Sequence, residues 1–193
     1  MSSNIVKLGG LAGIVAAALL LIAAVIDQVA PVELVYDSPN EYLHSAVSMV
    51  AFLAVVAAVV GVWALKSRTG QLRRLAAVAA WMTGLGYGFV ALLNAVNLIQ
   101  GERTLNMVRL GAALVMLIGS VILGVIVVVT KVLPWWCGVL MIIAFPLGHF
   151  ANALFPSAEN LLYVLLWGSV GIALLTRANA PAEPTVRHPA RVG

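Results

Sequence analysis

The most constraining feature of this sequence is a series of six long apolar stretches separated by short polar segments. The clearest of them, Glu41 to Leu65, is apolar from its second turn until the chain reaches Lys66. At about 1.5 Å of rise per residue, a helix of this length crosses a hydrocarbon layer roughly 30 Å thick. The pattern predicts an all-α polytopic integral membrane protein, a bundle of six transmembrane helices.

The composition agrees with this class and argues against two others. Charged residues make up 9% of the chain, against about 25% in soluble domains, and 63% of the chain is hydrophobic. Six spans use nearly all of the 193 residues, which leaves no room for a soluble catalytic domain. The net charge of +4 does not indicate nucleic-acid binding, because the cations flank apolar spans and form no patch with interleaved aromatic residues.

The spacing of breakers and polar loops predicts one six-helix transmembrane domain over residues 1–176. The expected spans cover residues 8–29, 41–65, 75–99, 107–130, 135–155 and 161–176. Residues 177–193 are rich in Pro and Ala and have no apolar period, so we expect a disordered cytoplasmic tail. The pairs Gly9/Gly13 and Gly84/Gly88 each predict a helix face that a neighbouring backbone approaches closely.

The cations are distributed unevenly between the two sides of the predicted bundle. Two of the 11, Arg103 and Arg109, lie on the side away from the termini. The other nine lie on the side of both termini: Lys7, Lys66, Arg68, Arg73, Arg74, Lys131, Arg177, Arg187 and Arg191. Because an excess of Lys and Arg marks the cytoplasmic side, we expect a multi-pass protein of the cell membrane with both termini in the cytoplasm.

Polar residues within the spans gather near their outer ends, whereas the inner halves hold little beyond Thr83 and Ser120. Ionisable residues in a membrane usually face the bundle interior or a water-filled cavity, so the cluster predicts a polar pocket in the outer leaflet. Spacings of three or four residues put several of its members in pairs on one helix face. The candidate ligand-binding residues are Asp27, Ser48, Tyr87, Asn94, Asn97, Arg109 and Asn152. Tyr42 and Tyr163 are instead predicted to be anchors at the outer interface.

Two histidines, at similar predicted depth, are the main candidates for chemistry. Glu41-x-x-His44 places a carboxylate one turn before an imidazole, which suits orienting the ring or moving a proton. The candidate catalytic residues are therefore His44, Glu41 and His149. A neutral imidazole also binds haem iron or a divalent metal. His44 and His149 are the candidate metal ligands, although zinc usually takes three or four protein ligands.

The Glu41-x-x-His44 pattern resembles the Glu-x-x-His at the outer end of a helix in haem A synthases. The resemblance covers four residues of one helix, and it implies a bound haem. That family pairs its histidines across a half of four helices, whereas the fourth predicted span here contains no histidine.

Three classes of function remain open from the sequence. The first is a membrane enzyme, or a cofactor- or lipid-binding protein, that uses the outer pocket. The second is an accessory or assembly subunit of a larger membrane complex, and the third is a small oligomeric transporter or channel. Membrane lipids are expected partners, and a homo-oligomer or a larger complex is an alternative. The polar residues can also form a structural girdle, with interhelical hydrogen bonds worth about 0.6 kcal/mol each. No catalytic motif decides whether the protein is an enzyme.

Overall fold

The structure is a computed structural model that describes residues 3–29, 38–66, 72–101, 106–152, 154–155 and 157–180. The described ranges contain six helices and no strand. The helices are α1 Ser3–Val29, α2 Pro39–Lys66, α3 Arg73–Gln100, α4 Asn106–Thr130, α5 Trp135–Asn152 and α6 Ala158–Asn179. All six are long and apolar enough to cross a membrane, which confirms the predicted all-α transmembrane bundle.

The helix ends differ most from the predicted ones in α1, α5 and α6. Helix α1 begins five residues earlier than expected, and α6 extends in both directions, so that Glu159 and Arg177 are helical. Helix α5 ends at Asn152, because the amides of Leu154 and Phe155 turn back to donate to the carbonyl of Ala151. The loop residues 30–37 and the rest of the predicted tail, residues 181–193, lie outside the described residues.

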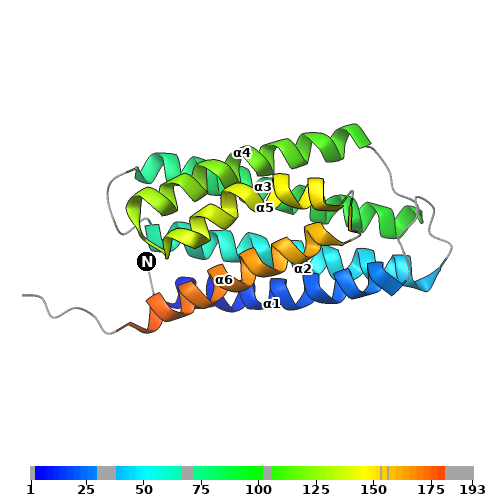
Figure 1. Ribbon diagram of the computed structural model, residues 1–193, viewed down its shortest axis with the longest axis horizontal. Coiled ribbons are helices and arrows are strands. Elements are labelled where there is room, and N and C mark those ends of the chain that lie inside the picture. Colours follow the sequence, from blue (N-terminus) through cyan, green and yellow to red (C-terminus); the bar gives the residue numbers. More distant parts are fainter. Residues whose placement is uncertain are drawn as a thin grey trace, which may run out of the picture.

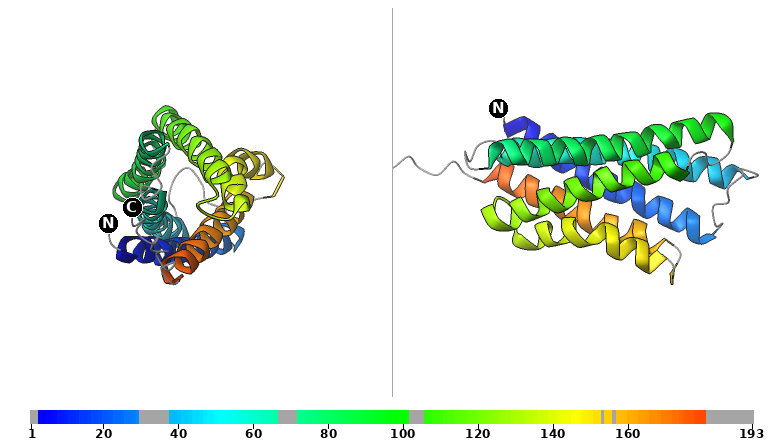
Figure 2. Two further views of the ribbon diagram at one scale, coloured as in Figure 1. Left: turned by 90° about the vertical axis from the view of Figure 1, so that its left-hand side faces the viewer. Right: turned by 90° about the horizontal axis from the view of Figure 1, so that it is seen from above.

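The helices alternate in direction and form a ring. Each helix packs against the next one in the chain, α6 packs against α1, and α2 makes a smaller contact with α6. Across the described part of the chain, α1 does not pack against α4, nor α2 against α5. Figure 1 shows that α1 begins at the same end of the bundle at which α6 ends, and Figure 2 shows the ring along its axis. We call this end the terminal end and the opposite one the distal end.

Glycines bring the first helix close to two neighbours. A Cβ atom added at Gly9 would lie 2.5 Å from the Cα of Gly61 on α2, and one at Gly13 would lie 2.9 Å from the Cα of Gly171 on α6. Apolar burial favours helix association little in lipid, so close backbone packing of this kind is what joins the helices. The predicted contact of the Gly9/Gly13 pair is confirmed.

The Gly84/Gly88 pair on α3 does not make the predicted backbone contact within the described chain. A Cβ atom at either position would meet only a methyl group of Val56, at 3.9 Å. The two glycines instead border an apolar groove of about 580 Å³ between α2 and α3. The intervening Gly86 faces the other way, where an added Cβ would lie 2.8 Å from the Cα of Met116 on α4.

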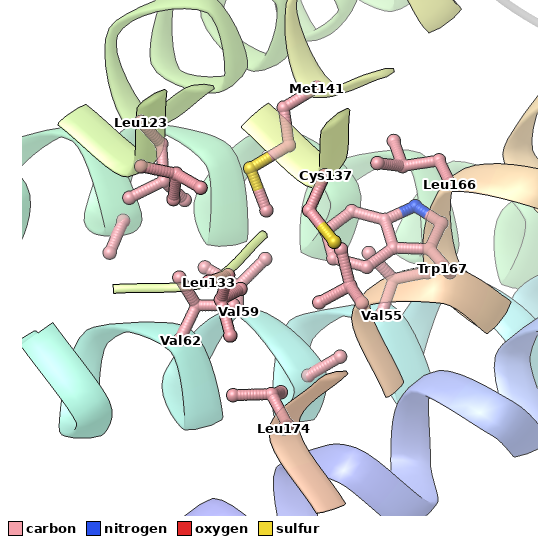
Figure 3. Packing of buried hydrophobic residues seen from close by; sticks show 14 of the residues in the cluster. Val55, Val59, Val62, Leu123, Leu133, Cys137, Met141, Leu166, Trp167 and Leu174 are labelled. Carbon is pink, nitrogen blue, oxygen red and sulfur yellow. The ribbon is translucent and has the colours of Figure 1, made fainter. Parts of the chain in front are cut away.

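Apolar side chains fill the terminal half of the bundle. Figure 3 shows Cys137 and Met141 of α5 beside Trp167 of α6 and valines of α2. The labelled residues of this core are each at most 2% exposed: Val55, Val59, Val62, Leu123, Leu133, Cys137, Met141, Leu166, Trp167 and Leu174. The core lies between the terminal end and the polar residues of the distal half.

The arrangement gives the predicted orientation a direct test. We expect reporter fusions after Lys66 and after Arg177 to read as cytoplasmic, and a reporter inserted within residues 31–40 to read as external. The physical reason is the excess of cations at the terminal end, where the described Arg73, Arg74 and Lys131 lie. A cytoplasmic reading from the 31–40 insertion would reverse the orientation.

Candidate functional site

The distal half of the bundle holds a polar cavity of about 660 Å³, lined by side chains from all six helices. Its apolar lining includes Phe52 and Met116, on α2 and α4. Its polar lining comprises Asp27 on α1, His44, Ser45 and Ser48 on α2, Asn94 on α3, Arg109 on α4, His149 and Asn152 on α5, and Glu159, Asn160 and Tyr163 on α6. His44 and Phe52 are eight residues apart on α2, so the lining spans about 12 Å along the bundle axis.

Most of the residues that the sequence singled out come together here. The cavity is lined by Asp27, His44, Ser48, Asn94, Arg109, His149 and Asn152. Three further candidates, Glu41, Tyr87 and Asn97, are buried but do not line it. The bundle therefore separates the candidates into a group around the cavity and a group packed between helices.

Glu41 has a local structural role at the start of α2. Its carboxylate accepts a hydrogen bond from the backbone amide of Ser38, three residues earlier, at 2.7 Å. The segment Ser38-Pro39-Asn40-Glu41 has the residue types of a capping box, and Pro39 occupies the first helical position, where proline is favoured. This contact fixes the first turn of α2, and His44 and Ser45 in the next turn line the cavity.

An aromatic layer lies beneath the cavity, between the polar residues and the apolar core. Tyr87 of α3 is at its centre, with ring centroids 5.7 Å from Phe52, 6.1 Å from Tyr163 and 5.5 Å from Trp167. The indole Nε1 of Trp167 donates a hydrogen bond to the Tyr87 hydroxyl at 3.3 Å. Since Phe52 and Tyr163 also line the cavity, this layer is its floor.

One hydrogen bond positions the cation of the cavity. Arg109 near the start of α4 donates from Nη2 to the Oδ1 atom of Asn94 on α3, at 3.0 Å. A guanidinium has five N–H donors in a planar fork, a geometry that matches carboxylate and phosphate groups. The contact holds the guanidinium on the side of the helix bundle that α3 and α4 form.

The anionic groups lie on a different side. Asp27 near the end of α1 accepts a hydrogen bond from the Ser157 hydroxyl at 2.8 Å, which ties α1 to the turn before α6. Glu159 follows in the first turn of α6 and interacts electrostatically with His149 and Arg109. A Cβ at Gly148 would lie 3.0 Å from the Cα of Glu159, so this glycine lets α5 and α6 approach where Glu159 and His149 meet. The carboxylates therefore belong to the α1–α6 side.

The two histidines belong to helices that do not pack against each other. His44 extends from α2 and His149 from α5, and both line the cavity. The His149 ring stacks on Phe145 one turn earlier, with ring centroids 6.2 Å apart and an interplanar angle of 6°. The histidines approach the cavity from different sides of the ring, so a small molecule between them could contact both.

Sequence reasoning missed three lining residues on α6. Glu159 and Asn160 were placed in a loop, because the span was expected to begin at residue 161. Tyr163 was expected at the interface, yet it is 2% exposed and lines the cavity. Its hydroxyl lies beside Glu159 and Tyr87. The signal that could have found them was Ser157 and Glu159, residue types typical of a helix start.

The donor set around the cavity does not resemble a metal centre. Within the described ranges, no three His, Cys, Asp or Glu side chains converge in a way that could hold a metal ion. The two cavity histidines carry imidazole groups, which can form hydrogen bonds and transfer protons.

Comparison with protein-family models, curated proteins and solved structures found no match to this chain.

Proposed function

We propose that this membrane protein binds a small polar ligand in the distal cavity and holds it against two histidines that can exchange protons with it. The observation that carries the proposal is the convergence of polar side chains from all six helices on one volume of about 660 Å³. That volume lies within the range of about 300–1,000 Å³ that is usual for small-molecule sites.

A purely structural girdle would look different. Polar groups that only join helices satisfy one another directly across a helix pair, as Arg109 and Asn94 do. Here polar side chains from all six helices also surround one shared space.

The proposed chemistry is acid–base chemistry. An imidazole titrates near neutral pH and can accept a proton at one nitrogen while donating from the other. His44 and His149 are the proposed catalytic residues, and the remaining polar lining is proposed to bind and orient the ligand. We propose for Glu41 a positioning role through the first turn of α2. If the predicted orientation holds, the ligand enters from the outer face or outer leaflet of the cell membrane.

A transporter is the second candidate, and one feature of α5 favours it. Pro146 lies inside this helix, between the cavity-lining Phe145 and His149. Proline removes one helical hydrogen bond and favours a bend, and broken helices near a binding site are typical of transporters. Transport would require the aromatic floor and the apolar core below it to open.

The cavity is tested by filling it. Ala113 on α4 lines the cavity, whereas Val115 on the same helix is 39% exposed and does not. We expect Ala113→Phe to abolish the rise in melting temperature that a bound ligand produces, and Val115→Phe to leave it intact. The measurement is a thermal-shift screen of the detergent-solubilised protein against amino acids, polyols and soluble lipid-headgroup fragments.

A ligand present at about 100 times its Kd stabilises the folded state by about 2.7 kcal/mol, so the expected shift is measurable. If the ligand raises the melting temperature equally in Ala113→Phe and Val115→Phe, it binds outside the cavity and the proposal is overturned. The absence of any shift for the parent protein, together with no ligand in native mass spectra, would also contradict it.

A further inference from the structure

We infer that the ligand of this cavity is a zwitterion, with an anionic group held at the Arg109 side and a cationic group held at the Glu159 and Asp27 side. The inference rests on the proposed function, because it names the chemical class of the molecule bound at the same site. Two sources share this chemistry: a phospholipid headgroup that carries a phosphate and an amine, and a free amino acid.

The first step is the position of the charges around the ring. Arg109 extends from α4 and is fixed to Asn94 on α3. Asp27 and Glu159 extend from α1 and α6, which pack against each other, whereas α4 packs against neither of them. The cavity therefore has a basic side on α3 and α4 and an acidic side on α1 and α6, and Glu159 and Arg109 are near enough to interact electrostatically.

The second step is the match of each side to one kind of group. A guanidinium binds carboxylate and phosphate oxygens through parallel N–H donors, and the Asn94 amide keeps it oriented. On the other side, carboxylates and the Tyr163 phenol oxygen can accept hydrogen bonds from an ammonium group. The Ser157 hydroxyl fixes one of these carboxylates, that of Asp27.

The third step excludes ligands of a single sign. The lining carries two carboxyl groups and one guanidinium, so it presents groups of both signs. A purely anionic ligand would face the carboxylates without compensation, and a purely cationic one would face the guanidinium. Charges that lose water without gaining a partner are strongly unfavourable inside a protein, so complementarity selects a ligand with both signs.

The test compares one zwitterion with its two halves. The probes are glycerophosphoethanolamine, glycerol 3-phosphate as the anionic half and ethanolamine as the cationic half, with β-alanine as the amino-acid arm. Binding is measured by calorimetry on the full chain in detergent, and phosphatidylethanolamine in nanodiscs supplies the lipid arm. We expect at least one zwitterion to bind tenfold or more tightly than either half. Tighter binding of the headgroup or its lipid identifies a lipid source, and tighter binding of β-alanine identifies an amino acid.

Substitutions on each side of the cavity test which charged group of the ligand that side binds. Arg109→Gln should lower the affinity for the preferred zwitterion tenfold or more while leaving ethanolamine unchanged. Glu159→Gln should lower the affinity for the zwitterion similarly, while the affinity for glycerol 3-phosphate should stay unchanged or rise. Arg74→Gln removes an exposed cation at the terminal end and is the matched control. If Arg109→Gln does not fold, Arg109→Lys keeps the charge without the planar fork and should still weaken binding of the anionic group.

The result that overturns the inference is distinct from the one that overturns the proposed function. The zwitterion inference is wrong if glycerol 3-phosphate or ethanolamine binds as tightly as the zwitterion. It is also wrong if the compound whose binding Ala113→Phe abolishes is singly charged or neutral. In both cases the cavity remains a binding site. If zwitterion binding persists unchanged in Ala113→Phe, both are wrong, because binding then occurs outside the cavity.

Discussion

Replacing Gly86 by alanine is expected to destabilise the protein by about 1–3 kcal/mol, whereas the same change at Gly84 should leave stability within about 1 kcal/mol of the parent. The two glycines lie on one helix, two residues apart, and differ in what a methyl group would meet. At Gly86 it would lie 2.8 Å from both the Cα and the backbone nitrogen of Met116, and backbone atoms cannot turn aside. At Gly84 the only neighbour is a side-chain methyl of Val56 at 3.9 Å.

The measurement is the melting temperature of each variant in detergent, followed by size-exclusion chromatography. Gly111 serves as a second control, because an added Cβ there would meet nothing within 4 Å. A loss of stability at Gly84 equal to that at Gly86 would show that the α2–α3 groove is occupied in solution. A tolerated Gly86→Ala would show that α3 and α4 are farther apart than the structure has them.

Replacing His44 or His149 by alanine is expected to weaken ligand binding about tenfold or more, which corresponds to about 1.4 kcal/mol or more. The effects should not add: the double variant should lose little beyond the larger single loss. The reason is that both rings line one cavity, so removing either disturbs the same bound molecule. The measurement is isothermal titration calorimetry with the ligand found in the screen. It compares the parent, the two single variants and the double variant as a double-mutant cycle.

The third histidine of the chain, His188, supplies the control, since it lies in the tail beyond the described residues. His188→Ala should leave affinity unchanged. Additive losses at His44 and His149, matched by equal losses in melting temperature, would instead mark two separate structural histidines. A pH profile adds a readout that stability alone would not move, since proton transfer through an imidazole changes activity near neutral pH.

The Gly9/Gly13 pair makes the predicted close contact with neighbouring backbones, and the Gly84/Gly88 pair does not. Both outcomes have one explanation. A glycine pair four residues apart makes a smooth helix face, but it does not specify which helix uses that face. Helix α1 uses Gly9 and Gly13 against its neighbours, whereas α3 packs on α4 through Gly86 and leaves the Gly84/Gly88 pair at a groove. Local spacing is therefore insufficient to predict the partner of a small-residue face.

The sequence by itself determined the class of protein, the number of helices and the polar character of one end. These follow from local quantities: the length of each apolar stretch, the breakers between them and the depth of each polar residue along its helix. Depth was enough to group His44, Asn94 and His149, because alternating helices bring equal depths to one end of the bundle.

Only the tertiary structure decided which of these residues share a cavity. Rotation of each helix about its axis places Asn94 in the lining and Asn97, three residues later, outside it, although both are buried. The start of α6 at Ala158 moved Glu159 from a presumed loop to the cavity wall. Such rotations and boundaries are set by contacts between residues far apart in sequence, at glycines such as Gly148 and Gly171, and no single apolar pattern contains them.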